Sequence, residues 1–256
     1  MMLRPVLTIA RYTVLEARHN RLGPLLLLVA LAALGFSGFL NQLALTESRQ
    51  LQAALLAATL RLAAVFLVAT FVVTSMLREA HDKGLELLLA LPLPRAAYLL
   101  GKLAGYGALA LAPALLFGAL GLFFAPPAQA ALWGLSLWCE LWIVAAFSLL
   151  CALSFSQVAP ALAAGAGFYL LARAIGGLQL IGHGRFGSHS PAQRAVGAGL
   201  DLVAALLPRL DSFTRTEWLM YHTGNAAALL DIGLQTLLYV GLLTAAALFD
   251  LYRKSL

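Results

Sequence analysis

Six long apolar stretches, separated by short polar segments, dominate the pattern of residues along this chain. They cover roughly residues 22 to 43, 57 to 77, 98 to 124, 131 to 154, 158 to 181 and 228 to 249. A helix needs about 20 mainly apolar residues to cross a bilayer, so each stretch is long enough to span one. The pattern predicts an all-α integral membrane protein in which residues 1 to 256 form a single domain with six transmembrane helices.

Two segments outside these spans are also predicted to contain helices. Within residues 1 to 21, apolar side chains recur at helical spacing, which predicts a helix lying in the membrane interface with its arginines among lipid phosphates. Residues 183 to 227 form the longest connection, and its segments Ser190–Gln193 and Thr214–Glu217 have the form of capping boxes, which predicts two short exterior helices. The apolar run 196 to 207 is too short to span the membrane, so it either lies on the outer interface or re-enters the bilayer.

The composition agrees with a membrane protein. The chain is 62% hydrophobic and 11% charged, whereas a soluble domain is roughly 25% charged. The two cysteines, Cys139 and Cys151, lie twelve residues apart on one predicted helix and cannot reach each other, so no intramolecular disulfide is expected.

The basic residues predict the orientation of the spans. Lysine and arginine near the ends of membrane helices favour the cytoplasmic side. With the N-terminus inside, ten of the seventeen basic residues are cytoplasmic: Arg4, Arg11, Arg18, Arg21, Arg78, Lys83, Arg95, Lys102, Arg253 and Lys254. Arg49, Arg61, Arg185, Arg194, Arg209 and Arg215 are then assigned to the exterior. Both termini are therefore expected in the cytoplasm, and the net charge of +6 reflects topology and lipid contact, with no nucleic-acid partner expected.

One dense polar segment, residues 78 to 95, separates the second and third spans. If it is helical, its acidic residues fall on one narrow face and leucines cover the rest. The acidic face consists of Glu79, Asp82 and Glu86, with Lys83 at its edge. Pro92 and Pro94 end the helix. This predicts a stiff cytoplasmic helix through which a soluble partner could transmit a force to two spans. A solvated loop whose leucines rest on the bilayer surface fits the residues equally well.

Four strings in and after this loop resemble the cytoplasmic loop of type 2 ATP-binding-cassette (ABC) exporter permeases. They are Arg78-Glu79, Gly84-Leu-Glu86, Leu91-Pro-Leu-Pro-Arg95 and Tyr98-Leu-Leu-Gly-Lys102. Residues 10 to 21 are similar to the elbow helix of that family, and the chain most resembles its copper-enzyme maturation branch. The resemblance implies that residues 78 to 95 are a coupling helix that docks on an ATPase subunit. The implied docking residues are Glu79, Asp82, Lys83, Glu86, Leu88, Leu89 and Arg95.

The resemblance further implies an exporter in the bacterial cytoplasmic (inner) membrane, built from two permease copies or homologues and a dimer of P-loop ABC ATPase subunits. The sequence contains no Gly-x-x-x-x-Gly-Lys-Ser/Thr phosphate loop, so ATP and Mg are expected on the partner and no cofactor is expected in this chain. The alternatives are an intramembrane lipid-modifying enzyme and a passive scaffold. Against an enzyme, the sequence contains neither a Gly-x-Ser-x-Gly nor a His-Glu-x-x-His motif. The cargo is left open.

Three ionisable residues, Glu140, Arg173 and Asp231, fall at a similar depth in the outer half of the predicted bundle. Such groups are costly unless they are paired or hydrated, and they often mark substrate routes. We expect a polar cluster built on a pair between Glu140 and Arg173, with Asp231 nearby. A pair that only fixes helix packing, with Asp231 in water, is an equal alternative. The exterior histidines match no metal-ligand spacing, so no metal site is expected. They are His183, His189 and His222.

Overall fold

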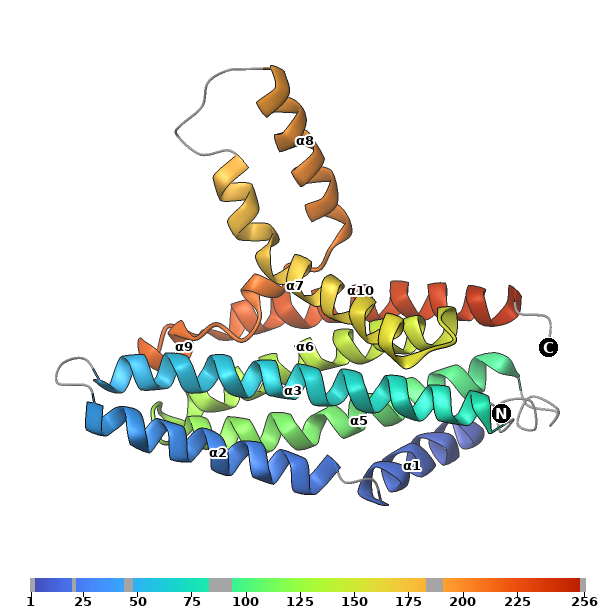
Figure 1. Cartoon of the computed structure of the whole chain (residues 1–256), viewed down its shortest axis with the longest axis horizontal. Helices are drawn as coiled ribbons and strands as arrows, with labels where there is room; N and C mark the ends of the chain where they lie inside the picture. Colours follow the sequence, from blue (N-terminus) through green and yellow to red (C-terminus); the bar gives the residue numbers. More distant parts are fainter. Residues whose placement is uncertain (1–2, 20–21, 44–47, 83–93, 183–190, 254–256) are drawn as a thin grey trace.

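The computed structural model describes residues 3–19, 22–43, 48–82, 94–182 and 191–253, and the regular structure in these ranges is helical. The helices are α1 (Leu3–His19), α2 (Leu22–Leu43), α3 (Ser48–His81), α5 (Arg95–Gly121), α6 (Pro127–Ser154), α7 (Val158–Gly182), α8 (Pro191–Leu206), η1 (Leu210–Ser212), α9 (Glu217–Met220) and α10 (Ala226–Arg253). Figure 1 shows α2, α3, α5, α6 and α10 running along one axis as a bundle. The predicted all-α class is confirmed.

Five helices of the described residues are long and apolar enough to cross a membrane. They are Gln52–His81, Arg95–Gly121, Pro127–Ser154, Val158–Leu180 and Ala226–Arg253. The chain is therefore a multi-pass membrane protein. Four of the predicted spans agree closely with these helices, but α3 starts nine residues before the predicted span 57 to 77 and ends four residues after it. A sixth candidate consists of Arg4–Ala17 and Leu22–Phe36, two parts bent by 56° relative to each other.

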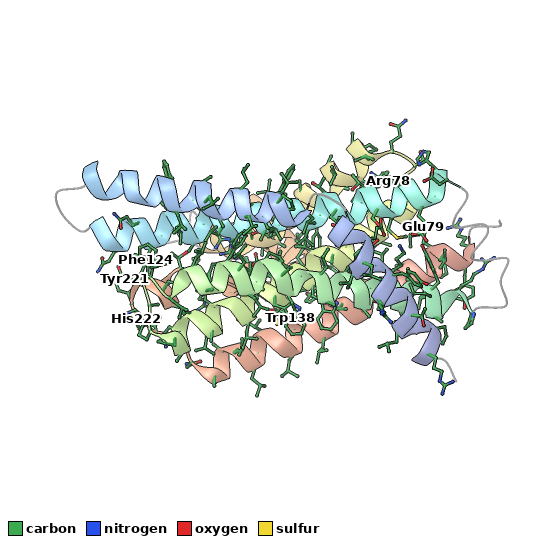
Figure 2. All side chains as sticks on the ribbon, turned by 90° about the horizontal axis from the view of Figure 1, so that it is seen from below. Arg78, Glu79, Phe124, Trp138, Tyr221 and His222 are labelled. Atoms are coloured by element: carbon green, nitrogen blue, oxygen red, sulfur yellow. The ribbon has the colours of Figure 1, made fainter. Side chains whose placement is uncertain are left out.

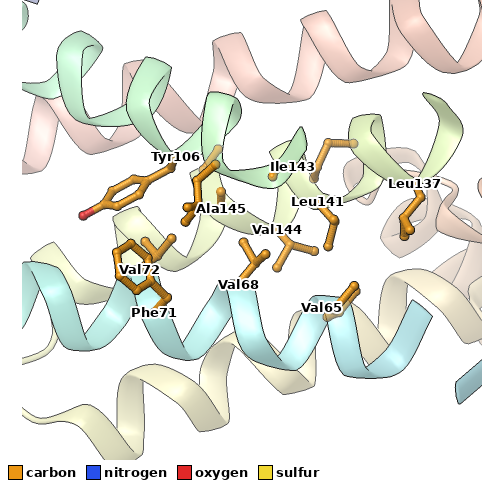
Figure 3. Packing of buried hydrophobic residues seen from close by; sticks show 14 of the residues in the cluster. Val65, Val68, Phe71, Val72, Tyr106, Leu137, Leu141, Ile143, Val144 and Ala145 are labelled. Atoms are coloured by element: carbon orange, nitrogen blue, oxygen red, sulfur yellow. The ribbon is translucent and has the colours of Figure 1, made fainter. Parts of the chain in front are cut away.

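The core lies around α6, which packs against α3, α5, α7 and α10. Figure 3 shows Leu141 and Ala145 of α6 close to Val68 of α3 and among the buried residues of the bundle. Small residues let α5 and α6 approach closely, since a Cβ added to Gly118 would lie 3.2 Å from the Cα of Gly134. By contrast, only 22% of the most apolar stretch of α7 or of α10 is buried within the chain. Those two helices present most of their surface to lipid or to another protein.

Helix α1 crosses the first turns of α5. Two glycines of α5 make the contact possible, because a Cβ on Gly101 would lie 2.7 Å from Ile9 Cβ and one on Gly105 would lie 2.6 Å from Thr13 Cβ. The opposite face of α1 is open, with Tyr12 69% exposed. Helix α1 thus packs on the bundle at two glycines and leaves its other face free for lipid, which agrees with the predicted elbow helix. Its place in the membrane stays a prediction.

Helices α7 and α8 form a hairpin. The second half of α7 and the whole of α8 lie side by side and project away from the bundle (Figure 1). Gln179 Nε2 on α7 donates a hydrogen bond of 3.0 Å to Asp201 Oδ1 on α8. Leu202 and Leu206 of α8 are 68% and 73% exposed. The helix predicted after Ser190 is thus a 16-residue helix, although Ser190 itself lies outside the described residues.

The segment from Pro208 to Gly224, which we call the strap, folds back over one end of the bundle. Its buried hydrophobic side chains are Leu210, Phe213, Trp218 and Leu219. The capping box predicted at Thr214 is wrong. Helix α9 begins at Glu217 after Thr216, which makes no side-chain cap, and Thr214 is a buried residue with a φ of 42°. Its hydroxyl is used instead in a contact with α6, which overrides the local capping pattern.

Candidate functional site

The loop end of the bundle, where Arg78–Asp82 leave α3 and Pro94–Arg95 enter α5, is held by a buried ion cluster. The Lys102 ammonium on α5 lies 2.5 Å from Glu79 Oε2 on α3 and 3.7 Å from Glu16 Oε2 on α1. Its side chain is only 7% exposed. The other oxygen of Glu16 accepts a 2.7 Å hydrogen bond from the hydroxyl of Ser75 on α3. One lysine therefore joins three helices at the place where the loop is attached.

This cluster changes the interpretation of Glu79. Arg78 and Glu79 continue α3 rather than start a separate helix, and they lie at the opposite end of the bundle from Tyr221 and His222 (Figure 2). The Glu79 side chain, 18% exposed, is turned to Lys102. A nearly buried ammonium needs such a partner, because an unpaired charge there would lose its hydration without compensation. The Glu79 carboxylate therefore makes its ion pair within the chain rather than with a docked partner.

Arg95, another predicted docking residue, also makes contacts within the chain. Its Nη1 donates a 3.1 Å hydrogen bond to the Leu251 carbonyl at the end of α10, and its guanidinium lies 5.9 Å from the centre of the Tyr252 ring. A cation is favourable at the carbonyl end of a helix and over an aromatic face. Arg95 therefore fastens the start of α5 to the end of α10.

The rest of the predicted docking set lies in or beside the loop. Asp82 follows α3 as an exposed turn residue. Four further residues lie outside the described residues, namely Lys83, Glu86, Leu88 and Leu89. The docking surface they were expected to form stays a prediction, now centred on Asp82 and residues 83 to 91 rather than on Glu79 and Arg95.

A second polar cluster, formed around Glu140 of α6, lies at the strap end of the bundle. Glu140 is completely buried. The Tyr169 hydroxyl on α7 donates a 2.9 Å hydrogen bond to its Oε1, and the Thr214 hydroxyl of the strap donates to its Oε2. Arg173 Nη1 lies 3.6 Å from Oε1. The structure thus places the two residues of the predicted pair within ion-pair distance, whereas Asp231 is an exposed residue of α10 outside these contacts.

Arg173 and further side chains of α3 and α6 hold the backbone of the strap. Arg173 Nη1 donates to the carbonyls of Leu210 and Phe213, the latter at 2.9 Å. Arg61 Nη1 on α3 donates to the Thr214 carbonyl at 3.3 Å. The Thr214 amide donates to the Ser136 hydroxyl on α6 at 2.8 Å. Helices α3, α6 and α7 therefore all bind one short stretch of strap backbone.

A comparison with protein families identifies the chain. A family model described as ABC-2 family transporter protein matches residues 40–180, more than half of the sequence. The chain belongs to the ABC-2 transporter family. A search of the curated proteins finds no match. Members of this family have a permease-type role, are typically non-catalytic transport subunits and generally work with an ABC ATPase. The narrower resemblance to the copper-enzyme maturation branch stays a prediction.

The region that matches the ABC-2 family model contains the central residues of both ion clusters but not all of their partners. Glu79, Lys102, Glu140 and Arg173 lie within residues 40–180, whereas Glu16 and the strap lie outside them. The two clusters thus combine residues of the matched region with residues from the flanking parts of the chain.

Sequence reasoning missed several residues of these clusters. Arg61 was assigned to the exterior, although it lies inside the predicted span 57 to 77; the structure places it on α3 beside the Glu140 cluster. Its position within an apolar stretch was the signal that could have found it. Lys102 gave the same signal, since it is the fifth residue of the predicted span 98 to 124, but it was assigned to the cytoplasmic end of that span. Glu16 gave no such signal, because it lies in a segment already explained as an amphipathic helix.

The exterior histidines form no described metal site. In the part of the chain that the structure describes, no group of three or more His, Cys, Asp or Glu side chains could hold a metal ion. His222 is an exposed residue at the end of the strap with a φ of 57°, while His183 and His189 lie outside the described residues. Cys139 and Cys151 are free, buried thiols of α6.

Proposed function

We propose that this chain is the permease subunit of an ABC exporter, which moves its cargo using ATP hydrolysed by a separate ATPase subunit. In this proposal α2 completes six spans, α1 is the elbow, and both termini and the loop of residues 78 to 95 face the cytoplasm of a bacterial cell. Two permease copies or homologues combine with an ATPase dimer, which holds ATP and Mg. Membership of the ABC-2 family supports the general role.

The observation that supports coupling most directly is the Lys102 cluster. It clamps the end of α3 and the start of α5, the two points to which the loop is attached, and it adds α1 through Glu16. Arg95 adds the end of α10. A force on the loop would therefore be shared by four helices at once. That arrangement suits a partner that drives motion of the whole bundle from one side.

Copurification tests the docking part of the proposal. The tagged chain, purified from its native membrane, should carry a P-loop ATPase. The double substitution Asp82→Lys and Glu86→Lys should release that ATPase, because it reverses two charges on the proposed docking face without touching the Lys102 cluster. Glu217→Lys with Asp231→Lys is the matched control, since it makes the same charge change at an exposed position of the strap and an exposed position of α10.

The outcomes separate the candidate functions. An ATPase that leaves with the loop variant and stays with the control supports the permease. A wild-type chain that purifies without any ATPase contradicts the proposal and favours a scaffold or an intramembrane enzyme. Equal loss of the ATPase from both variants would show that net charge, and not this loop, governs the association.

A further inference from the structure

A groove runs between α3 and α7 on the outer surface of the bundle. Its volume is about 400 Å³, within the range of roughly 300 to 1,000 Å³ typical of small-molecule sites. The side chains that line it are almost all apolar, and they include Leu62, Phe66 and Ala69 from α3 and Ala166, Tyr169 and Leu170 from α7. Phe66 and Leu170 are 65% and 60% exposed, so the groove opens sideways to whatever surrounds the bundle.

Two arginines stand at the strap end of this groove. Arg61 directly precedes Leu62 on α3, and Arg173 lies one helical turn beyond Tyr169 on α7. Their guanidiniums bind neighbouring carbonyls of the strap, those of Thr214 and Phe213. The two charges therefore lie close together at the end of an apolar channel.

One buried and one exposed carboxylate lie near these two arginines. Among the described residues, Glu140 is the carboxylate within ion-pair distance of Arg173, and its two oxygens already accept from Tyr169 and Thr214. Asp211 approaches α7 at Gly176 but is exposed, so water weakens its field. The Arg61 Nε is buried and has no hydrogen-bond partner among the described residues. An anion that reaches Arg61 would supply the missing acceptor.

We propose that this groove binds an anionic membrane lipid, with one acyl chain along α3 and α7 and the phosphate at Arg61 and Arg173. Guanidinium groups bind phosphate oxygens in paired hydrogen bonds, and apolar walls suit a hydrocarbon chain. The depth agrees. Arg61 precedes Arg78, in the last turn of α3, by seventeen residues, or about 25 Å along a helix. In a hydrocarbon layer of about 30 Å, that places the arginines near the far headgroups.

A second groove provides an internal comparison. It lies between α5 and α6, has a volume of about 340 Å³ and is lined by Leu115, Leu122, Leu135, Trp138 and other uncharged residues. Bulk lipid should fill it without regard to headgroup charge. The lipid proposal does not depend on the docking of an ATPase, so its failure would leave the proposed function untouched.

Photolabelling of the full chain in lipid nanodiscs tests the proposal. The probes are phosphatidylglycerol and phosphatidylcholine that carry the same photoreactive acyl chain. We expect the anionic probe to label peptides of the α3–α7 groove on the order of fivefold more than the zwitterionic probe, and both probes to label the α5–α6 groove alike. Ala166→Phe, which fills the groove, should abolish the preference, whereas Ala245→Phe on the exposed side of α10 should preserve it.

The role of the arginine charge is tested separately from the role of the groove's shape. Arg61→Gln should lower labelling by the anionic probe to that by the zwitterionic probe, and Arg215→Gln, which changes an exposed arginine of the strap, should not. Equal labelling of the α3–α7 groove by both probes in the wild type would overturn the proposal. Absence of labelling, together with a disulfide between two copies of a Phe66→Cys variant, would also overturn it and make this face an interface between copies.

Discussion

Removing the charge of Lys102 should destabilise the whole bundle. The Lys102 and Glu79 side chains are 7% and 18% exposed, so the Lys102→Met substitution would leave one nearly buried carboxylate without its cation. Breaking a buried pair in this way costs roughly 3 to 5 kcal/mol. Glu16 is 36% exposed and regains water, which places the expected loss at about 3 kcal/mol. At roughly 2 to 4 °C per kcal/mol for a chain of this size, Tm should fall by about 6 to 12 °C.

The assay is thermal unfolding of the detergent-purified chain, with Arg11→Met on the exposed face of α1 as the control. The double variant Lys102→Met with Glu79→Gln should recover most of the lost Tm, because it removes the orphaned charge together with its partner. A Lys102→Met chain as stable as the Arg11→Met control would refute the reasoning. So would a double variant no more stable than Lys102→Met alone.

Three further substitutions test other parts of the fold. Glu140→Leu removes the acceptor that holds the strap, so the free energy of unfolding should fall by about 3 kcal/mol, as measured by thermal unfolding. Trypsin should also cleave the strap faster, and an uncleaved strap would contradict the anchoring role of Glu140. Gly118→Leu should cost about 1 to 3 kcal/mol by forcing α5 away from α6, while Gly167→Leu, which has open space around it, should change Tm little. Gln129→Leu breaks two 3.0 Å hydrogen bonds to the backbone of Gly224, and hydrogen exchange at the end of the strap should then rise about tenfold; unchanged exchange would show that these bonds do not hold the strap.

The sequence predicted the parts of this fold that depend on composition and short spacing. Long apolar runs located the membrane helices, since few other structures require twenty such residues. Ionisable residues are rare inside those runs, so Glu140 and Arg173 stood out and their pairing could be inferred from similar depth. The structure brings them to 3.6 Å.

The sequence did not predict the contacts between segments that lie far apart along the chain. Helical spacing put Glu79 on one acidic face with Asp82 and Glu86, but α3 continues through Glu79 and its side chain turns to Lys102 on another helix. Nothing local marks Lys102 as buried, because burial comes from α1 packing over the glycines of α5. The pattern at Thr214 likewise looked like a helix cap, and a tertiary hydrogen bond to Glu140 decided its structure instead.

Site-specific cross-linking in membrane vesicles tests the central claim, that a separate ATPase docks on the loop between α3 and α5. A cysteine introduced at Asp82, which is exposed at the end of α3, should cross-link to a P-loop ATPase through a short bifunctional reagent. A cysteine introduced at the exposed Glu217 of the strap should not. Cross-linking of the ATPase from Glu217, or from neither position in vesicles that retain the ATPase, would contradict the account.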